Sequence, residues 1–216
     1  MDAQVCITAD DYGLSIGVNE AIEDLVNRGA VDAVSIMVHR DAHLATVNRI
    51  QAGDIRFGLH LVFTEFEGVT AEPGSVPPGH FSELFRNIVV RGSVQRTLRA
   101  EARAQMERYV GLGLPLDFIN SHQHVHLFPT IWKIVLELAV DFGFRGIRTA
   151  QRHRLSWSRT GLVALSSKMA YWSQPADQMT HMIPIGIDDS GRLVGEQLAR
   201  ALSVPNASLA GHEVWE

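Results

Sequence analysis

Short apolar runs that favour β-strands alternate with longer amphipathic runs along most of this 216-residue chain. Such alternation is typical of an α/β fold with a parallel sheet, because parallel neighbours need a crossover connection. We expect a distorted (β/α) barrel of the TIM type, complete or lacking its last strand, as one domain over residues 1–216. An open doubly wound sheet is the alternative. The predicted strands are 4–9, 31–38, 55–61, 115–121 and 145–149, and the predicted helices are 16–29, 41–51, 81–90, 93–113 and 129–143.

Composition and charge exclude several classes of protein. The formal net charge of −5 and the lack of a basic stripe argue against nucleic-acid binding. No apolar run approaches the roughly 18 residues that a membrane-spanning helix needs. The opening residues do not resemble a signal peptide, so a cytoplasmic protein is expected. Cys6 is the only cysteine and lies in an apolar run, where a small buried side chain is expected.

Two common kinds of active site lack a motif in this chain. The turn after the first predicted strand, "ADDYGLSIGVNE", carries neither a G-x-G-x-x-G pattern nor a P-loop, so nothing indicates nucleotide binding. A G-x-S-x-G nucleophile elbow is also absent from the sequence. A hydrolase that uses a serine or cysteine nucleophile therefore has no candidate residue.

Polar side chains collect at the ends of three predicted strands. The first strand is followed by Asp10 and Asp11, the third ends in His60, and the fourth ends in Ser121 and His122. Because the carboxyl ends of parallel strands meet at one edge of the sheet, these groups are expected to converge there. One carboxylate and two imidazoles suit a divalent metal such as zinc, cobalt or iron, whereas magnesium would need more oxygen ligands.

The second carboxylate at this edge is then free to act as a base. Neighbouring residues of a regular strand point to opposite sides, so Asp10 and Asp11 are expected to divide these two roles. Simpler roles are possible for each residue taken singly, since an Asp-Asp pair can cap a helix and a lone histidine can belong to the core. The remaining candidates are read as surface or turn residues: His39, His43, His80, His153, His181, Asp117, Asp188 and Asp189.

Three stretches, "ITADDYGLSIGVNEAI", "FGLHLVF" and "LPLDFINSHQHVHLFPTIW", resemble the YdjC-like carbohydrate deacetylases, a family that includes chitooligosaccharide deacetylases and hopanoid-biosynthesis-associated proteins. The resemblance runs from about Val5 to Thr149. It implies a distorted barrel that removes the N-acetyl group of an amino sugar with a divalent metal ion. Given the donor set, we expect one zinc ion, with magnesium or another divalent ion as the alternative. By this resemblance Asp11, His60 and His122 bind the metal, and Asp10 is the general base.

Other expectations from the same resemblance concern the rim of the site and the end of the chain. His124 and His126 would border the site, as substrate-binding residues or partners of the ligands. Family members carry a late histidine, in a Glu-Ile-Tyr/Met-x-His-Pro segment, as the general acid. Here Glu213–Trp215 matches only its beginning. We therefore expect the C-terminal strand and the His-Pro motif to be missing, with His124 or His126 as substitute acids and His212 poorly placed.

The substrate is expected to be an N-acetylated oligosaccharide or glycolipid, with the Gly- and Pro-rich stretch at 67–80 shaping the choice. A homodimer is compatible with the sequence. Three other functions stay open. A different metal hydrolase of the same barrel type would bind a second metal, using His124 or His126. A catalytically impaired protein would bind a saccharide without releasing acetate, and a structural domain would have no site at all.

Overall fold

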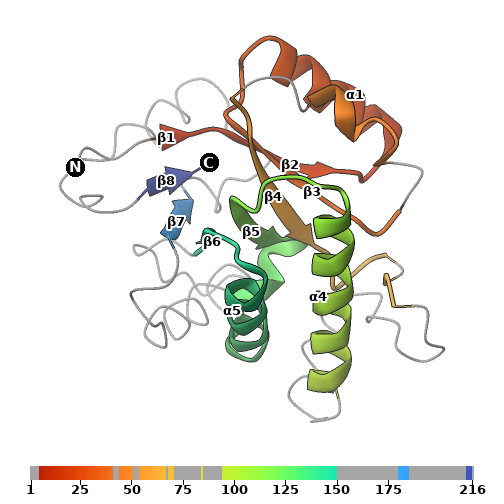
Figure 1. Ribbon diagram of the computed structural model, residues 1–216, viewed down its shortest axis with the longest axis vertical. Coiled ribbons are helices and arrows are strands. Elements are labelled where there is room, and N and C mark those ends of the chain that lie inside the picture. The colour runs from red at the N-terminus through yellow and green to blue at the C-terminus, as the bar shows by residue number, and fades with distance from the viewer. Residues whose placement is uncertain are drawn as a thin grey trace.

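Eight parallel strands form one sheet, in the order β1-β8-β7-β6-β5-β4-β3-β2 (Figure 1). The computed structural model describes residues 5–40, 44–50, 54–66, 68–70, 84, 94–149, 180–184 and 213–215. The strands are β1 (Val5–Cys6), β2 (Thr8–Tyr12), β3 (Ala33–Ile36), β4 (Arg56–Leu61), β5 (Phe118–Ser121), β6 (Gly146–Arg148), β7 (Thr180–Pro184) and β8 (Glu213–Trp215). The α/β class and the parallel sheet are thus confirmed.

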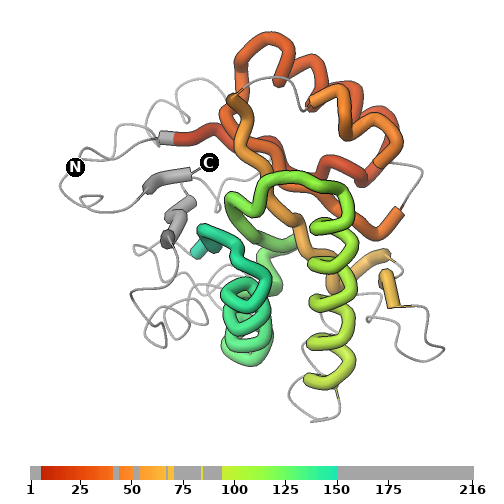
Figure 2. Tube along the Cα trace, in the orientation of Figure 1, coloured from red at the N-terminus to blue at the C-terminus, as the bar shows by residue number. Residues whose placement is uncertain are grey.

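The N-terminal segment occupies both ends of the strand order. Only Ile7 separates β1 from β2, and Figure 2 shows the chain running on from one into the other. β2 pairs with β3, whereas β1 pairs with β8, which in turn pairs with β7. In Figure 1 the red β1 accordingly lies beside the blue β8. β8 therefore has a paired neighbour on each side in this sheet.

The chain has helix α1 (Ile16–Asn27) after β2, helix α4 (Val94–Gly111) before β5 and helix α5 (Pro129–Phe142) after β5 and the 3-10 segment η2 (His122–Leu127). The predicted end signals are present, since Ser15 caps α1 through Val18 N at 3.2 Å and Pro129 opens α5. Gly143 ends α5 in the left-handed conformation. α4 and α5 pack side by side (Figure 1). Within the described residues, none of the helices combines the length and apolar character that crossing a membrane requires.

The two faces of the sheet differ in chemistry because side chains alternate along each strand. One face packs against the helices, and its residues belong to the main core: Val34, Ile36, Leu59, Leu61, Ile119 and Ile147. The other face has a small apolar cluster of Cys6, Ala33 and Phe118. Gly58 makes room for the Phe118 ring, which a Cβ at this position would strike. Further along the same strands, this second face carries the polar residues of the candidate site.

Several predicted elements differ from the structure. The first strand was expected to end at residue 9 but continues to Tyr12, because β2 keeps pairing with β3 past the two aspartates. Of the helix expected at 41–51, residues 44–50 are described: Leu44 is helical and Val47–Ile50 form the 3-10 helix η1, while residues 41–43 and 51 lie outside the described part. β7 was not predicted at all. Most of the expected loop at 67–80 and of the helix at 81–90 lies outside the described residues, as does most of the chain after residue 149.

Two buried polar side chains of α4 hold the chain that leaves β4. Gln105 brackets Val62, because its Oε1 accepts from Val62 N at 2.9 Å and its Nε2 donates to Val62 O at 2.6 Å. The fully buried Glu101 accepts hydrogen bonds from the backbone amides of Val69 and Thr70 and from the Thr70 hydroxyl. A buried carboxylate is tolerated only with such partners. The chain between Val62 and Thr70, which forms one rim of the site, is therefore anchored at both ends.

The turn after β2 depends on Gly13. Its φ is 98°, and a Cβ there would collide with the carbonyl oxygen of Met37. The Gly13 amide donates to Oδ1 of the buried Asn19 at 2.7 Å. Only glycine combines this backbone conformation with such a close approach.

We expect Gly13→Ala to lower the free energy of unfolding by roughly 1–3 kcal/mol, since a side chain would meet both a strained φ and a backbone oxygen. Gly17→Ala is the matched control, because that position lies in α1 with open space around it. This control should leave stability unchanged or raise it by up to about 1 kcal/mol. Urea unfolding measures both, and equal effects at the two glycines would contradict the role of Gly13.

Candidate functional site

A β-bulge turns both neighbouring aspartates toward the same side of the sheet. The three-residue step from Ala9 to Tyr12 in β2 lies opposite the two-residue step from Val34 to Ile36 in β3. Asp11 absorbs the extra residue with a left-handed backbone, at a φ of 67°. The strand is therefore not regular where the two carboxylates lie. The condition for their pointing to opposite sides, a regular strand, is therefore not met.

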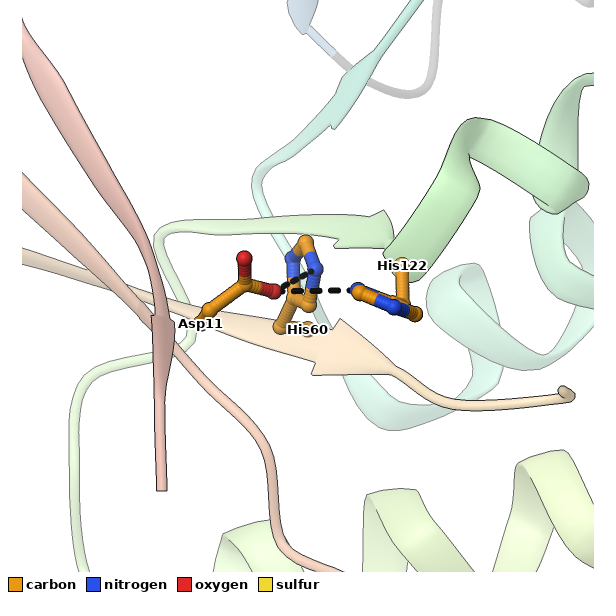
Figure 3. Close-up of side chains that lie close together, drawn as sticks. All are labelled: Asp11, His60 and His122. Atoms are coloured by element: carbon orange, nitrogen blue, oxygen red, sulfur yellow. Dashed lines mark hydrogen bonds and ion pairs between the residues drawn. The ribbon is translucent and has the colours of Figure 1, made fainter. Parts of the chain in front are cut away.

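Asp11, His60 and His122 come together at the carboxyl edge of the sheet (Figure 3). Oδ1 of Asp11 lies 3.0 Å from Nε2 of His60 and 3.1 Å from Nδ1 of His122. These residues come from the ends of three different strands, β2, β4 and the segment after β5. Their ligand atoms all lie within 4.8 Å of one another.

The ring of His60 is held from behind by Asn120 and Ser35. Its Nδ1 lies 2.7 Å from Oδ1 of Asn120 and 3.1 Å from Oγ of Ser35. The amide nitrogen of Asn120 donates to Asp10, so its oxygen faces the ring and accepts. Nδ1 of His60 therefore carries the proton, which leaves Nε2 free toward Asp11.

Asp10 lies beside this group and is bound by a network of donors. Arg148 donates to it from both Nη atoms of its guanidinium, with distances of 2.5 Å from Nη1 to Oδ2 and 3.1 Å from Nη2 to Oδ1. Ser35 and Asn120 also donate to Oδ1, at 2.6 and 3.0 Å. Burial would raise the pKa of Asp10, but the Arg148 guanidinium and these hydrogen bonds hold that pKa well below its usual range. Asp10 is therefore ionised at neutral pH.

The triad residues also affect one another's charge. Burial opposes the ionised form of Asp11, but its polar contacts with His122 and His60 lower its pKa well below the ordinary value. Burial likewise opposes a charge on His122, yet its hydrogen bond and attraction to Asp11, together with those to Glu65, raise its pKa. The protonation states of Asp11 and His122 therefore depend on each other.

Strained backbone is concentrated around the site. Among the described residues, the non-glycine residues with positive φ are Asp11, Glu65, Gln123 and His124. Gln123 and His124 belong to η2 (His122–Leu127), the irregular 3-10 segment that follows β5. Conformations of this kind cost about 1–3 kcal/mol each and persist where surrounding contacts impose them. These residues lie at the same edge of the sheet as Asp11, His60 and His122.

His124 and His126 differ in their surroundings. Burial lowers the pKa of His124 to about 4, with the Arg148 charge acting in the same direction. Its Nδ1 is buried and has no hydrogen-bond partner among the described residues. His126 is fully buried, and both ring nitrogens are occupied: Nε2 donates to the carbonyl oxygen of Arg148 at 2.8 Å, and Nδ1 accepts from Ser121 Oγ at 2.6 Å. Burial lowers the pKa of His126 to about 3. His126 thus fixes β6, and with it the backbone of Arg148.

The donor set suits a divalent metal. One carboxylate and two imidazoles are the protein ligands of many zinc sites that keep an open position. Oxygen and nitrogen ligands about 2.0–2.1 Å from a tetrahedral zinc lie roughly 3.3 Å apart. The separations of 3.0 and 3.1 Å around Oδ1 of Asp11 are close to this value. The second-sphere contact that metal-bound histidines usually have is present behind His60, in Asn120.

The structure brings together Asp10, Asp11, His60 and His122, as predicted from their positions at strand ends. His39 was expected at the surface but is buried, because it lies three residues after the end of β3 and packs against Phe66 at a ring-centroid distance of 4.9 Å. Asp117 binds the backbone amide of Phe57 at 3.0 Å. The other surface and turn candidates fall outside the described side chains: His43, His80, His153, His181, Asp188 and Asp189.

Four residues of the site were missed from the sequence. Arg148 is the last residue of β6 and Glu65 lies four residues after β4, so the strand-end rule that indicated the aspartates and histidines could have indicated these two as well. Ser35 and Asn120 are polar residues inside apolar strands, which is itself a signal. Arg148 is neither a metal ligand nor a base at neutral pH, so the residue types that indicate a metal site do not include it.

Several curated relatives of this chain are named as carbohydrate or chitooligosaccharide deacetylases. The chain is 33% identical over 144 residues to the carbohydrate deacetylase of Vibrio campbellii, covering 64% of this chain and 56% of that protein. It is 31% identical over 147 residues to the chitooligosaccharide deacetylase of Escherichia fergusonii, covering 66% and 58%. A carbohydrate deacetylase from Geobacillus stearothermophilus is 33% identical over 156 residues, covering 69% and 62%. The matched region thus spans less than two thirds of each of these relatives.

A solved structure shares the fold. The crystal structure of a protein from Enterococcus faecalis V583, to which cellobiose-phosphate cleavage is provisionally ascribed, superposes with a TM-score of 0.73. The match covers 100% of this chain and 80% of that one, at 19% sequence identity, and therefore speaks for the fold alone. The family model described as YdjC-like protein matches residues 4–210, nearly the whole chain, and this chain therefore belongs to the YdjC-like protein family.

Proposed function

We propose that this protein is a metal-dependent deacetylase that hydrolyses the N-acetyl group of an amino sugar. The observation that carries the proposal is the group of Asp11, His60 and His122 with the ionised Asp10 beside it. Membership of the YdjC-like family, and relatives named carbohydrate deacetylase and chitooligosaccharide deacetylase, support the substrate class. We infer that the metal is a single zinc ion and that the sugar is an oligosaccharide or a glycolipid.

We also infer that the sheet closes into a distorted barrel. The strand order that begins with β1 and ends with β2 supports this idea, because these two segments are successive parts of one N-terminal strand. A second support is the face that carries Cys6, Ala33 and Phe118, which pack with one another apart from the helices. In a barrel these side chains would fill the interior below the site.

In the proposed reaction a divalent metal held by the triad would polarise the amide carbonyl and acidify a water molecule. Asp10 accepts the proton of the attacking water. Its Oδ2 is the more available oxygen, since Oδ1 already accepts from Ser35, Asn120 and Arg148, whereas among the described residues Oδ2 accepts from Arg148 only. Arg148 keeps Asp10 ionised and also weakens it as a base, so the proton donor must itself be acidic.

We assign substrate contact to His124 and a supporting role to His126. The buried, unpartnered Nδ1 of His124 is available for a hydrogen bond, and its low pKa keeps the ring neutral. His126 has both nitrogens occupied, which argues against its use as the acid that protonates the departing amine. The same occupancy argues against a two-metal hydrolase that would use His126 as a further ligand. A protein that binds saccharides without hydrolysing them is the remaining alternative, and acetate release distinguishes it.

Metal analysis is the direct test of the site. The wild-type protein, dialysed against zinc and freed of excess ion, should retain about one zinc per chain. Asp11→Ala and His122→Ala should each lose most of it, because each removes one of three ligands. Asp117→Asn is the matched control, since Asp117 lies before β5 and keeps an oxygen for Phe57 N. Unchanged zinc content in both site variants would remove the assignment.

The role of Asp10 is tested by acetate release from an N-acetylated chitooligosaccharide. Asp10→Asn should retain zinc but lower the rate by roughly 10²–10⁴-fold, the usual contribution of a general base. The amide keeps an oxygen for Ser35 and Arg148 but cannot accept the proton. A wild-type protein that binds the saccharide without releasing acetate would support the binding-protein alternative. A variant as active as the wild type would exclude Asp10 as the base.

A further inference from the structure

We propose that Glu65 orients His122 from outside the ligand set and strengthens metal binding by it, an inference that rests on the proposed metal site. Glu65 lies four residues after the end of β4, on the chain segment anchored by Gln105 and Glu101. It would be the outer carboxylate of a carboxylate–histidine–metal arrangement.

The two nitrogens of His122 face different carboxylates. Nδ1 lies 3.1 Å from Oδ1 of Asp11, the same oxygen that Nε2 of His60 approaches to 3.0 Å (Figure 3). Nδ1 is therefore the nitrogen that faces the metal position. Nε2, on the other side of the ring, lies 3.4 Å from Oε2 of Glu65. A metal on Nδ1 requires the proton to be on Nε2, where Glu65 accepts it.

Glu65 is outside the ligand group itself. Among the described residues, the group whose ligand atoms lie within 4.8 Å of one another consists of Asp11, His60 and His122, without Glu65. Of the two ring nitrogens of His122, the Glu65 carboxylate contacts Nε2, which faces away from Asp11. Its place corresponds to that of Asn120 behind His60, where Oδ1 lies 2.7 Å from the nitrogen that faces away from the metal position. Both histidines would thus have an oxygen partner behind them.

Glu65 is held in this position although its side chain is 42% exposed. Gln123 donates its Nε2 to Oε1 of Glu65 at 2.5 Å, and the hydroxyl of the buried Thr64 donates to Oε1 of Gln123 at 3.1 Å. Glu65 and Gln123 both have left-handed backbones, with φ of 68° and 54°. A strained backbone of this kind persists where surrounding contacts impose it, and such residues cluster at functional sites, which supports a role for Glu65. Phe66 also lies against His122, with their ring centroids 5.8 Å apart.

A carboxylate behind a metal-bound imidazole fixes the ring's orientation and tautomer and raises its strength as a ligand. Loss of such a partner typically weakens metal binding by about 10–100-fold. The two histidines differ here, because His60 has a neutral amide behind it and His122 has a carboxylate. His122 is also the more exposed of the two rings, at 18% against 3%. An anchoring carboxylate therefore matters more for His122, whose ring is less confined by packing.

The test is the zinc dissociation constant, measured by competition with a chromophoric chelator, for the wild type, Glu65→Gln and Glu65→Ala. We expect both variants to bind zinc about 10–100-fold more weakly. Their cobalt complexes should keep the wild-type absorption bands, since no ligand is replaced. Glu137→Gln is the matched control, because Glu137 is 43% exposed and pairs with Arg99 away from the site. Its zinc affinity should equal that of the wild type, and the metal-free melting temperatures should agree.

The other outcomes distinguish failure of this inference from failure of the proposed metal site. Zinc binding by the wild type with affinities of Glu65→Gln and Glu65→Ala within twofold of it would overturn the role of Glu65 and leave the metal site intact. Loss of zinc as complete as in His122→Ala, with changed cobalt bands, would make Glu65 a ligand and also overturn the inference. A wild-type protein that binds no zinc would overturn the proposed metal site and the role of Glu65 with it.

Discussion

The bulge at Asp10 and Asp11 is the constraint on which the site depends. In a regular strand these neighbours would point to opposite sides, and one carboxylate would lie on the face covered by the helices, away from the site. The left-handed Asp11 brings both to the same side, so that His60 lies between them, 3.0 Å from Asp11 and 4.0 Å from Asp10. One carboxylate can then join the two imidazoles while the other stays with Arg148. This division of labour follows from backbone geometry.

Strain at the site is balanced by hydrogen bonds from around it. The left-handed residues Asp11, Glu65 and Gln123 each make side-chain contacts within the site. The segment that carries Glu65 is fixed to α4 through the buried Glu101 and Gln105. On the opposite rim, His126 ties η2 to the backbone of β6. Such anchoring lets a small group of residues keep an unfavourable backbone, because the surrounding contacts leave no cheaper arrangement.

Much of the fold could be predicted from periodicity and end signals. The strands near 31–38 and 55–61 and the helices near 93–113 and 129–143 are present, with ends shifted by a few residues. Prediction failed where pairing rather than local pattern decides. β2 continues past the aspartates because β3 continues beside it, and β7 is a strand in the sheet between β6 and β8. In both places the strand is decided by pairing with its neighbours, and the local sequence pattern did not indicate it.

The sequence by itself determined which side chains meet: two aspartates and two histidines at the ends of strands predicted to run parallel, and hence a convergence of candidate metal ligands at one edge. Only the tertiary structure decided which oxygen and nitrogen face each other, that Asp10 belongs to Arg148, and that Glu65 stands behind His122. The physical reason is distance along the chain. Asp10 and Arg148 are 138 positions apart, and their contact depends on the register of the strands between them and on a bulge of one residue. Local sequence encodes neither.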